Sequence, residues 1–170
     1  TATQDPAISA NGSRLFAPCG TSVFSYSVKT TKQTGLFPMH KGRVTAVCTG
    51  AKRADCGTPV ATGSSVGEVQ LWDASKGSSV LLASIDFEAP VFALRWPRED
   101  TLLVALGEAG GSVEVRQLEV SSLTDPGKVS SVPIEVAEAR GFDATGSGVA
   151  LLDRHDLCIW GAGWEKSRRY

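Results

Sequence analysis

The chain has 170 residues, of which 42% are hydrophobic and 21% charged, and its formal net charge is −1. This composition is typical of a globular protein, and near-neutrality excludes a general electrostatic attraction to nucleic acid. No run approaches the roughly 20 apolar residues of a membrane helix, and the opening TATQDPAISANGS has no signal-peptide core. Because the first residue is Thr and not Met, we expect an excerpt of a longer chain.

Short apolar runs recur along the whole chain, whereas helix signals are rare. Residues 113–116 alternate apolar and polar side chains, as a strand with one buried face does. The 18 glycines and eight prolines fall mostly between the runs and favour turns there. The sequence therefore predicts an all-β chain of many short strands. In chain order these are RLFAPCG, SVFSYSV, RVTAVCT, PVATGS, EVQLWD, SVLLASIDF, VFALRW, TLLVALG, SVEVRQLEV, GVALLD and LCIWG.

A two-strand unit, PVATGSSVGEVQLWD, has one counterpart before it and two after it. When the second strands are aligned, Tyr26, Trp72, Arg116 and Trp160 fall in register, in steps of 46, 44 and 44 residues. This spacing is close to the roughly 40–45 residues of one four-stranded propeller blade. We therefore predict units at 1–39, 40–88, 89–136 and 137–170.

The two ends of the chain fit this repeat less well. The first unit lacks a clear inner strand, so residues 1–12 are expected to be the tail of another element. KVSSVPIEV is expected as the outermost strand of the third unit, and the strands of the fourth begin near ARGFDATGSG and stop after CIWGAGW. Four units that do not close into a ring would expose apolar blade faces, so we expect further blades, or another chain, to cover the open side.

Over nearly its whole length the chain resembles the WD-repeat β-propellers, and the second unit carries this resemblance best. His40 precedes GRVTAV, and a Ser-rich strand is followed by Leu-Trp-Asp at 71–73. In that family a His, a strand Ser or Thr, the Trp and an Asp in the turn before the third strand form a hydrogen-bonded network. The resemblance assigns three of these roles to His40, to Thr62 or Ser64, and to Trp72.

The sequence departs from the family pattern at several positions. The Asp role is expected to be unfilled, because Ser-Ser-Val-Gly at 64–67 stands where the family has S-x-D-G. Arg-Gln replaces Trp-Asp in the third unit, and Trp160 is followed by Gly in the fourth. The fold assignment, an all-β WD40-like β-propeller with about four blades visible, therefore rests mainly on spacing. It implies part of a larger or partner-completed propeller.

His40 and Asp73 invite a catalytic interpretation, but a structural role is the better one. Asp73 opens the turn DASKG, where its side chain can accept backbone hydrogen bonds. The sequence has no phosphate-binding glycine loop, nucleophile elbow or HExxH motif. Its four cysteines and two histidines lack the spacings of a zinc site, and the cysteines are expected to be reduced thiols. We expect no catalytic residue, no metal and no cofactor.

The C-terminal segment GWEKSRRY interleaves basic and aromatic residues. Such a pattern can bind RNA phosphates and stack on bases, although a solvated strand end or linker is the simpler interpretation. The polar loop at 121–128 is a second candidate contact, and Arg95, Arg98 and Arg116 add positive charge that the sequence cannot place together. The candidate RNA or partner contacts are Lys166, Arg168, Arg169 and Tyr170, with Trp164 beside them.

Three stretches resemble one nucleolar subfamily of these propellers: SRLFAPCGTSVFSYSVKTTKQTG, VFALRWP and CIWGAGWEKSRRY. The subfamily comprises WD-repeat subunits of the transcription-linked U-three protein group in the small-subunit processome. The resemblance implies a non-catalytic nuclear and nucleolar scaffold in ribosomal small-subunit biogenesis and pre-rRNA processing. Its partners would be other protein subunits and pre-ribosomal RNA, with no membrane and no small-molecule substrate. A stand-alone propeller that recognises a peptide or protein tail is the alternative, and a propeller hydrolase is a weaker third hypothesis.

Overall fold

A computed structural model describes residues 4–38, 40–53, 57–75, 79–120, 124–125, 127–154, 156–161, 163 and 166–169. Within these ranges the chain forms sixteen β-strands and no α-helix. The prediction of an all-β chain of short strands is therefore confirmed. None of the described residues belongs to a helix long and apolar enough to cross a bilayer.

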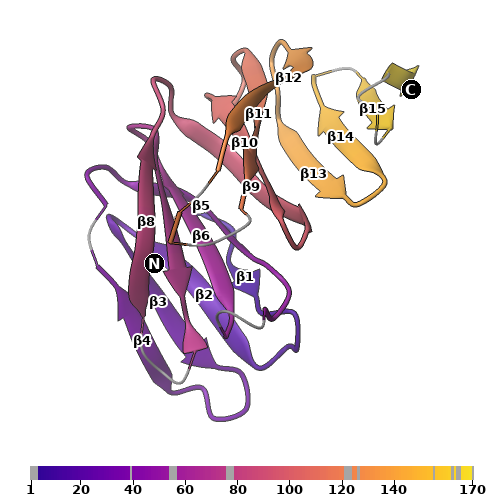
Figure 1. Cartoon of the computed structure of the whole chain (residues 1–170). Helices are drawn as coiled ribbons and strands as arrows, with labels where there is room; N and C mark the ends of the chain where they lie inside the picture. The colour runs from indigo at the N-terminus through magenta and orange to yellow at the C-terminus, as the bar shows by residue number, and fades with distance from the viewer. Residues whose placement is uncertain are drawn as a thin grey trace.

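The strands form four antiparallel sheets, each built from four strands consecutive in the chain (Figure 1). Sheet 1 contains β1 (Ala7–Ile8), β2 (Arg14–Cys19), β3 (Ser22–Ser27) and β4 (Gln33–Phe37). Sheet 2 contains β5 (Val44–Thr49), β6 (Pro59–Ser64), β7 (Glu68–Asp73) and β8 (Val80–Asp86). Sheet 3 contains β9 (Val91–Arg98), β10 (Thr101–Gly107), β11 (Val113–Glu119) and β12 (Val129–Val136). Sheet 4 contains β13 (Gly141–Thr145), β14 (Gly148–Leu152), β15 (Leu157–Gly161) and β16 (Lys166–Arg169).

Three hydrophobic clusters join the sheets in chain order. Between sheets 1 and 2, the ring of Phe37 meets those of Phe16 and Trp72 edge-on, at centroid distances of 5.7 and 5.3 Å. Leu71 of sheet 2 lies in one cluster with Leu94 and Val104 of sheet 3. The cluster between sheets 3 and 4 includes Val115, Ile134, Phe142 and Trp160. The sheets therefore stack as successive propeller-like blades, and Figure 1 shows sheets 1 and 4 at opposite ends of the series.

Three strands, β1, β4 and β16, lie where none was expected. Strand β4, of sequence QTGLF, is the outer strand of sheet 1 and pairs with β3. β1 pairs with β2 through Ala7–Phe16 and Ile8–Leu15, so this segment supplies the inner strand of sheet 1 and is not the tail of another element. β16 pairs with β15 and supplies the outer strand of sheet 4, after the last strand that was expected in the fourth unit. Strand β1 has only two residues and β16 reads KSRR, so neither contains the apolar run that predicts a strand.

All four sheets place the repeat position in the same register. Tyr26, Trp72, Arg116 and Trp160 each lie on the third strand of a sheet, opposite an aliphatic residue of the second strand. Those residues are Leu15, Val60, Val104 and Val149. The register between the third and fourth strands shifts directly before this position in sheets 1, 2 and 4, and one residue earlier in sheet 3. The spacing read from the sequence thus corresponds to one repeating sheet.

Candidate functional site

A chain of hydrogen bonds, here named the Trp72 network, joins four side chains of sheet 2 and the segment before it. Trp72 Nε1–H donates to the Thr62 hydroxyl at 3.0 Å, and the same hydroxyl lies 2.7 Å from His40 Nε2. His40 Nδ1 lies 3.0 Å from Glu68 Oε2. Thr62 and Trp72 are fully buried, and His40 and Glu68 each expose only 4% of their surface. These polar groups therefore satisfy one another inside the protein.

The chemistry of the four groups indicates where the protons lie. An indole N–H can only donate, and an ionised carboxylate can only accept. The Thr62 oxygen therefore accepts from Trp72, and His40 Nδ1–H donates to Glu68. In a neutral imidazole Nε2 then carries no proton, so it accepts from the Thr62 hydroxyl. One tautomer of neutral His40 thus completes the network.

The pKa shifts of the two ionisable groups agree with this arrangement. Burial lowers the pKa of His40 below its ordinary value of 6.5, and the charge and hydrogen bond of Glu68 oppose only part of this effect. Burial alone would raise the pKa of Glu68. This effect of burial is outweighed by hydrogen bonds from the Lys41 backbone amide, at 2.9 Å, and from Gln70, and by the interaction with His40. The pKa of Glu68 therefore lies below its ordinary value of 4.5. At neutral pH His40 is neutral and Glu68 is ionised.

Glu68 is the member of the network that the sequence analysis missed. The position where the family pattern has Asp is occupied by Val66, whose side chain is exposed in the turn. The carboxylate comes instead from the first residue of β7, whose backbone N–H donates to Ser64 Oγ at 3.1 Å. The expectation of an unfilled acidic role was therefore wrong. The available signal was a glutamate directly after Ser-Ser-Val-Gly.

Ser64 and Asp73 lie beside the network and not in it. The Ser64 hydroxyl holds the first residue of β7, as described above. Asp73 Oδ1 accepts from the backbone N–H groups of Gly57 at 3.2 Å and Ser75 at 2.8 Å, and Oδ2 accepts from the Ser75 hydroxyl at 2.9 Å. Asp73 thus closes the turn after β7 with its carboxylate.

The repeat position keeps its place in the other sheets, but different residues surround it. In sheet 4, Leu151 and Cys158 occupy the register places that Thr62 and Gln70 hold in sheet 2, and Trp160 is buried against sheet 3. In sheet 3 the position is Arg116, whose guanidinium lies 3.0 Å from the Glu114 carboxylate on the same strand.

Arg95 and Arg98, the other two arginines that the sequence could not place, also have partners. Arg95 Nε donates to Asp143 Oδ1 at 2.8 Å, and Arg98 Nη2 donates to the Gly146 carbonyl at 3.1 Å. Both contacts run from sheet 3 to sheet 4. These side chains therefore help to hold two sheets together.

The basic residues of the C-terminal segment lie on one strand. Lys166, Arg168 and Arg169 belong to β16 and stand opposite Trp160, Ile159 and Cys158 of β15. Trp164 and Tyr170 lie outside the described residues, as do residues 121–123 and 126 of the polar loop. Contact of this segment with RNA or a partner stays a prediction.

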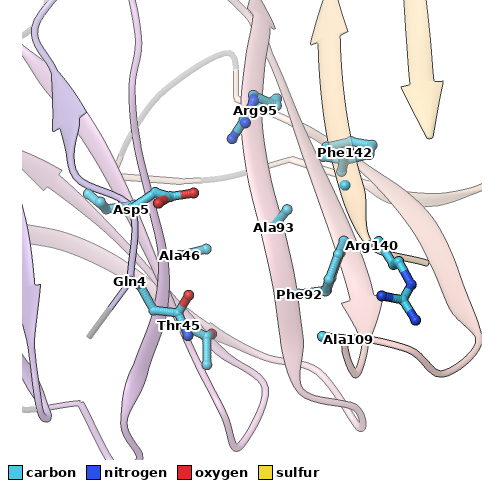
Figure 2. Close-up of a pocket in the computed structure, with 12 residues that line it drawn as sticks. Gln4, Asp5, Thr45, Ala46, Phe92, Ala93, Arg95, Ala109, Arg140 and Phe142 are labelled. Carbon is cyan, nitrogen blue, oxygen red and sulfur yellow. The ribbon is translucent and has the colours of Figure 1, made fainter. Parts of the chain in front are cut away.

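A cavity of about 340 Å³ runs along the inner strands β5, β9 and β13. Figure 2 shows Gln4 and Asp5 on the N-terminal segment, Phe92 and Arg95 on β9, and Arg140 and Phe142 at the start of β13. Basic, acidic and aromatic side chains thus line one surface. Among the described residues, no group of three or more His, Cys, Asp or Glu side chains is placed to hold a metal ion.

Two comparisons with known proteins gave no relative. No family model matches the chain. No curated protein matches it either.

Proposed function

We propose that this chain is a non-catalytic scaffold that works through protein contacts. The observation that carries the proposal is the burial of the Trp72 network. His40, Glu68 and Thr62 are the residue types of an acid–base site, yet they lie inside a blade and hydrogen-bond to one another. Rigidly stacked sheets leave their edges and connecting loops available to partners.

We further assign the scaffold to the WD-repeat class. The supporting observation is the order of contacts from Trp72 through Thr62 to His40, which is the order that the family resemblance implies. Glu68 in the place of the family's Asp is a departure, and it preserves the carboxylate.

The proposed setting is the nucleolus, in ribosomal small-subunit biogenesis and pre-rRNA processing. The support is the likeness of three sequence stretches to processome subunits related to WD repeat-containing protein 75. In that setting the partners are other protein subunits of the particle and, through the basic residues of β16, pre-ribosomal RNA.

Affinity purification of the tagged chain from a nuclear extract, followed by identification of the bound proteins and RNA, tests this proposal. We expect early pre-ribosomal proteins and small-subunit rRNA precursor to co-purify with it. A chain recovered without such particles would contradict the nucleolar assignment. If the chain hydrolysed a substrate and this activity disappeared when Glu68 or Asp5 was replaced, the proposal of a non-catalytic scaffold would be contradicted.

The cavity at the inner strands favours a second candidate function, recognition of a peptide or protein tail. Arg140 offers positive charge in a cavity that Phe92 and Phe142 also line, which suits an acidic segment with an apolar side chain. Titration with a panel of short peptides would identify such binding. Arg140→Ala should weaken it, while Lys29→Ala in the turn after β3 should not.

A further inference from the structure

The turn between β1 and β2 contains Asn11, the only asparagine of the sequence, and Gly12 follows it directly. Both residues are exposed. Gly12 has φ +70°, and apart from its two chain neighbours no residue places an atom within 4 Å of the position that a Cβ would take. The backbone nitrogen of Gly12 is therefore not shielded by a side chain at this position.

Three hydrogen bonds converge on the side-chain oxygen of Asn11. Ser9 Oγ donates to Asn11 Oδ1 at 2.8 Å, Ser13 Oγ donates at 2.7 Å, and the Ser13 backbone N–H donates at 3.1 Å. Because a backbone N–H can only donate, the atom that it contacts is the amide oxygen and not the amide nitrogen. All three donors therefore polarise the side-chain carbonyl of Asn11.

These features fit the chemistry of asparagine deamidation. The Gly12 nitrogen bonds to Asn11 Cγ and loses its proton to water, which closes a five-membered ring and places a negative charge on Oδ1. The bond from Cγ to Nδ2 then breaks, and ammonia leaves with a proton returned by water. A further water molecule opens the succinimide at either carbonyl, which gives aspartate or isoaspartate. Overall, the amide and one water become a carboxylate and an ammonium ion.

The turn has two opposing effects on this reaction. Gly12 N–H donates to the Ser9 carbonyl at 2.8 Å, and this hydrogen bond must open before the nitrogen can attack. The three donors lie 2.7–3.1 Å from Oδ1, the range in which donors stabilise an oxyanion. Hydrogen bonds to a charged oxygen are stronger than those between neutral groups, so all three strengthen as the charge develops. The gain at three bonds outweighs the loss of one.

We propose that Asn11 is a self-modification site, at which the β1–β2 turn promotes conversion of the asparagine to aspartate and isoaspartate in the folded chain. Isoaspartate adds a methylene group to the main chain of the turn. Strand β1 pairs with β2 through Ala7–Phe16 and Ile8–Leu15, so a longer turn should weaken this short pairing. The modification therefore acts on the inner strand of sheet 1.

Incubation of the purified chain at pH 8, in buffer and in guanidinium chloride, tests the proposal. Trypsin digestion and mass spectrometry measure conversion in the peptide that ends at Arg14, and electron-transfer fragmentation distinguishes isoaspartate from aspartate. We expect faster conversion in the folded chain than in denaturant. Ser13→Ala removes one hydroxyl donor and should slow the reaction of the folded chain about tenfold. Ser147→Ala, in the turn between β13 and β14, is the matched control and should leave the rate unchanged.

The denatured samples separate the geometry of the turn from the local sequence. In denaturant Ser13→Ala should react at the wild-type rate, because no folded turn holds the donors in place. Slower conversion of Asn11 in the folded chain than in denaturant would show that the turn protects it, and the proposal would be wrong. A folded-state rate that Ser13→Ala leaves unchanged would also overturn it. Ser9→Ala removes the other hydroxyl donor and serves as a second variant, and far-ultraviolet circular dichroism reports whether each variant is folded.

Discussion

Trp72 and Trp160 occupy the same position in two different sheets. Each lies on the third strand opposite a valine, Val60 or Val149, and each is buried against the preceding sheet. The register places around them differ, because Leu151 in sheet 4 stands where Thr62 stands in sheet 2. The aromatic ring therefore serves the packing between blades, and the polar network is an addition to it.

Replacement of Trp72 should separate these two contributions. Trp72→Ala removes the ring from the cluster with Phe37 and should lower the free energy of unfolding by about 3–5 kcal/mol. Trp72→Phe keeps an aromatic ring but leaves Thr62 without its donor, so a loss of about 1–3 kcal/mol is expected. Urea denaturation measures both, and an unchanged midpoint for the alanine variant would show that the ring is not packed.

Stability should fall in acid in two stages that follow the network. The pKa of His40 is lower in the folded than in the unfolded chain, so the unfolded state binds more protons below pH 6.5. Stability is therefore lost as the pH falls from 6.5 through the pKa of His40 in the folded chain. The lowered pKa of Glu68 adds a second loss below pH 4.5. Urea midpoints measured from pH 8 to pH 3 would show both stages.

His40→Gln provides the matched comparison for the first stage. A glutamine side chain can both donate and accept but does not titrate. The variant should be less stable than the wild type at pH 8 and should lose the step that begins at pH 6.5. Asp86→Asn, which breaks the exposed pair with Lys41, should leave that step in place. A step of equal size in the glutamine variant would contradict the assignment to His40.

The turn before β7 should require glycine at position 67. Gly67 has φ +87°, and a Cβ there would collide with the backbone carbonyls of Phe87 and Ala89. Gly67→Ala should cost at least about 2 kcal/mol, from strain and collision together. Gly12 has a similar φ of +70° with open space around it, so Gly12→Ala should cost only about 1 kcal/mol. Equal costs in thermal denaturation would show that the collision is relieved.

The cysteines should differ strongly in reactivity. Burial raises the pKa of Cys48 to about 12, with Arg95 and a backbone hydrogen bond opposing part of the shift, whereas Cys19 is exposed. Iodoacetamide at pH 8 should therefore modify Cys19 at least about a hundredfold faster than Cys48, as measured by peptide mass spectrometry. The difference should vanish in denaturant. Rapid labelling of native Cys48 would contradict its burial.

The basic residues of β16 should contribute modestly to particle association. Replacing Lys166, Arg168 and Arg169 together with alanine removes three charges that could neutralise phosphates, so co-purification of pre-ribosomal RNA should weaken mildly and its salt dependence should decrease. Lys29, Lys32 and Lys52 are exposed lysines outside the candidate contacts, and their triple replacement is the charge-matched control. Complete loss of assembly in the first variant alone would mean that the strand is a principal contact.

The sequence by itself determined most of the strands and their repeat, because side-chain alternation and the spacing of Tyr26, Trp72 and Trp160 can be read directly along the chain. The residues of the polar network came from the resemblance to WD-repeat proteins. The strand prediction missed β1, β4 and β16, which lack a long apolar run and are strands because a neighbouring strand supplies their hydrogen bonds. Only the tertiary structure decided that Glu68 supplies the carboxylate. Whether the Glu68 carboxylate contacts His40 depends on how the turn at 65–67 positions β7 relative to the segment that contains His40. Residue spacing along the chain does not specify this geometry.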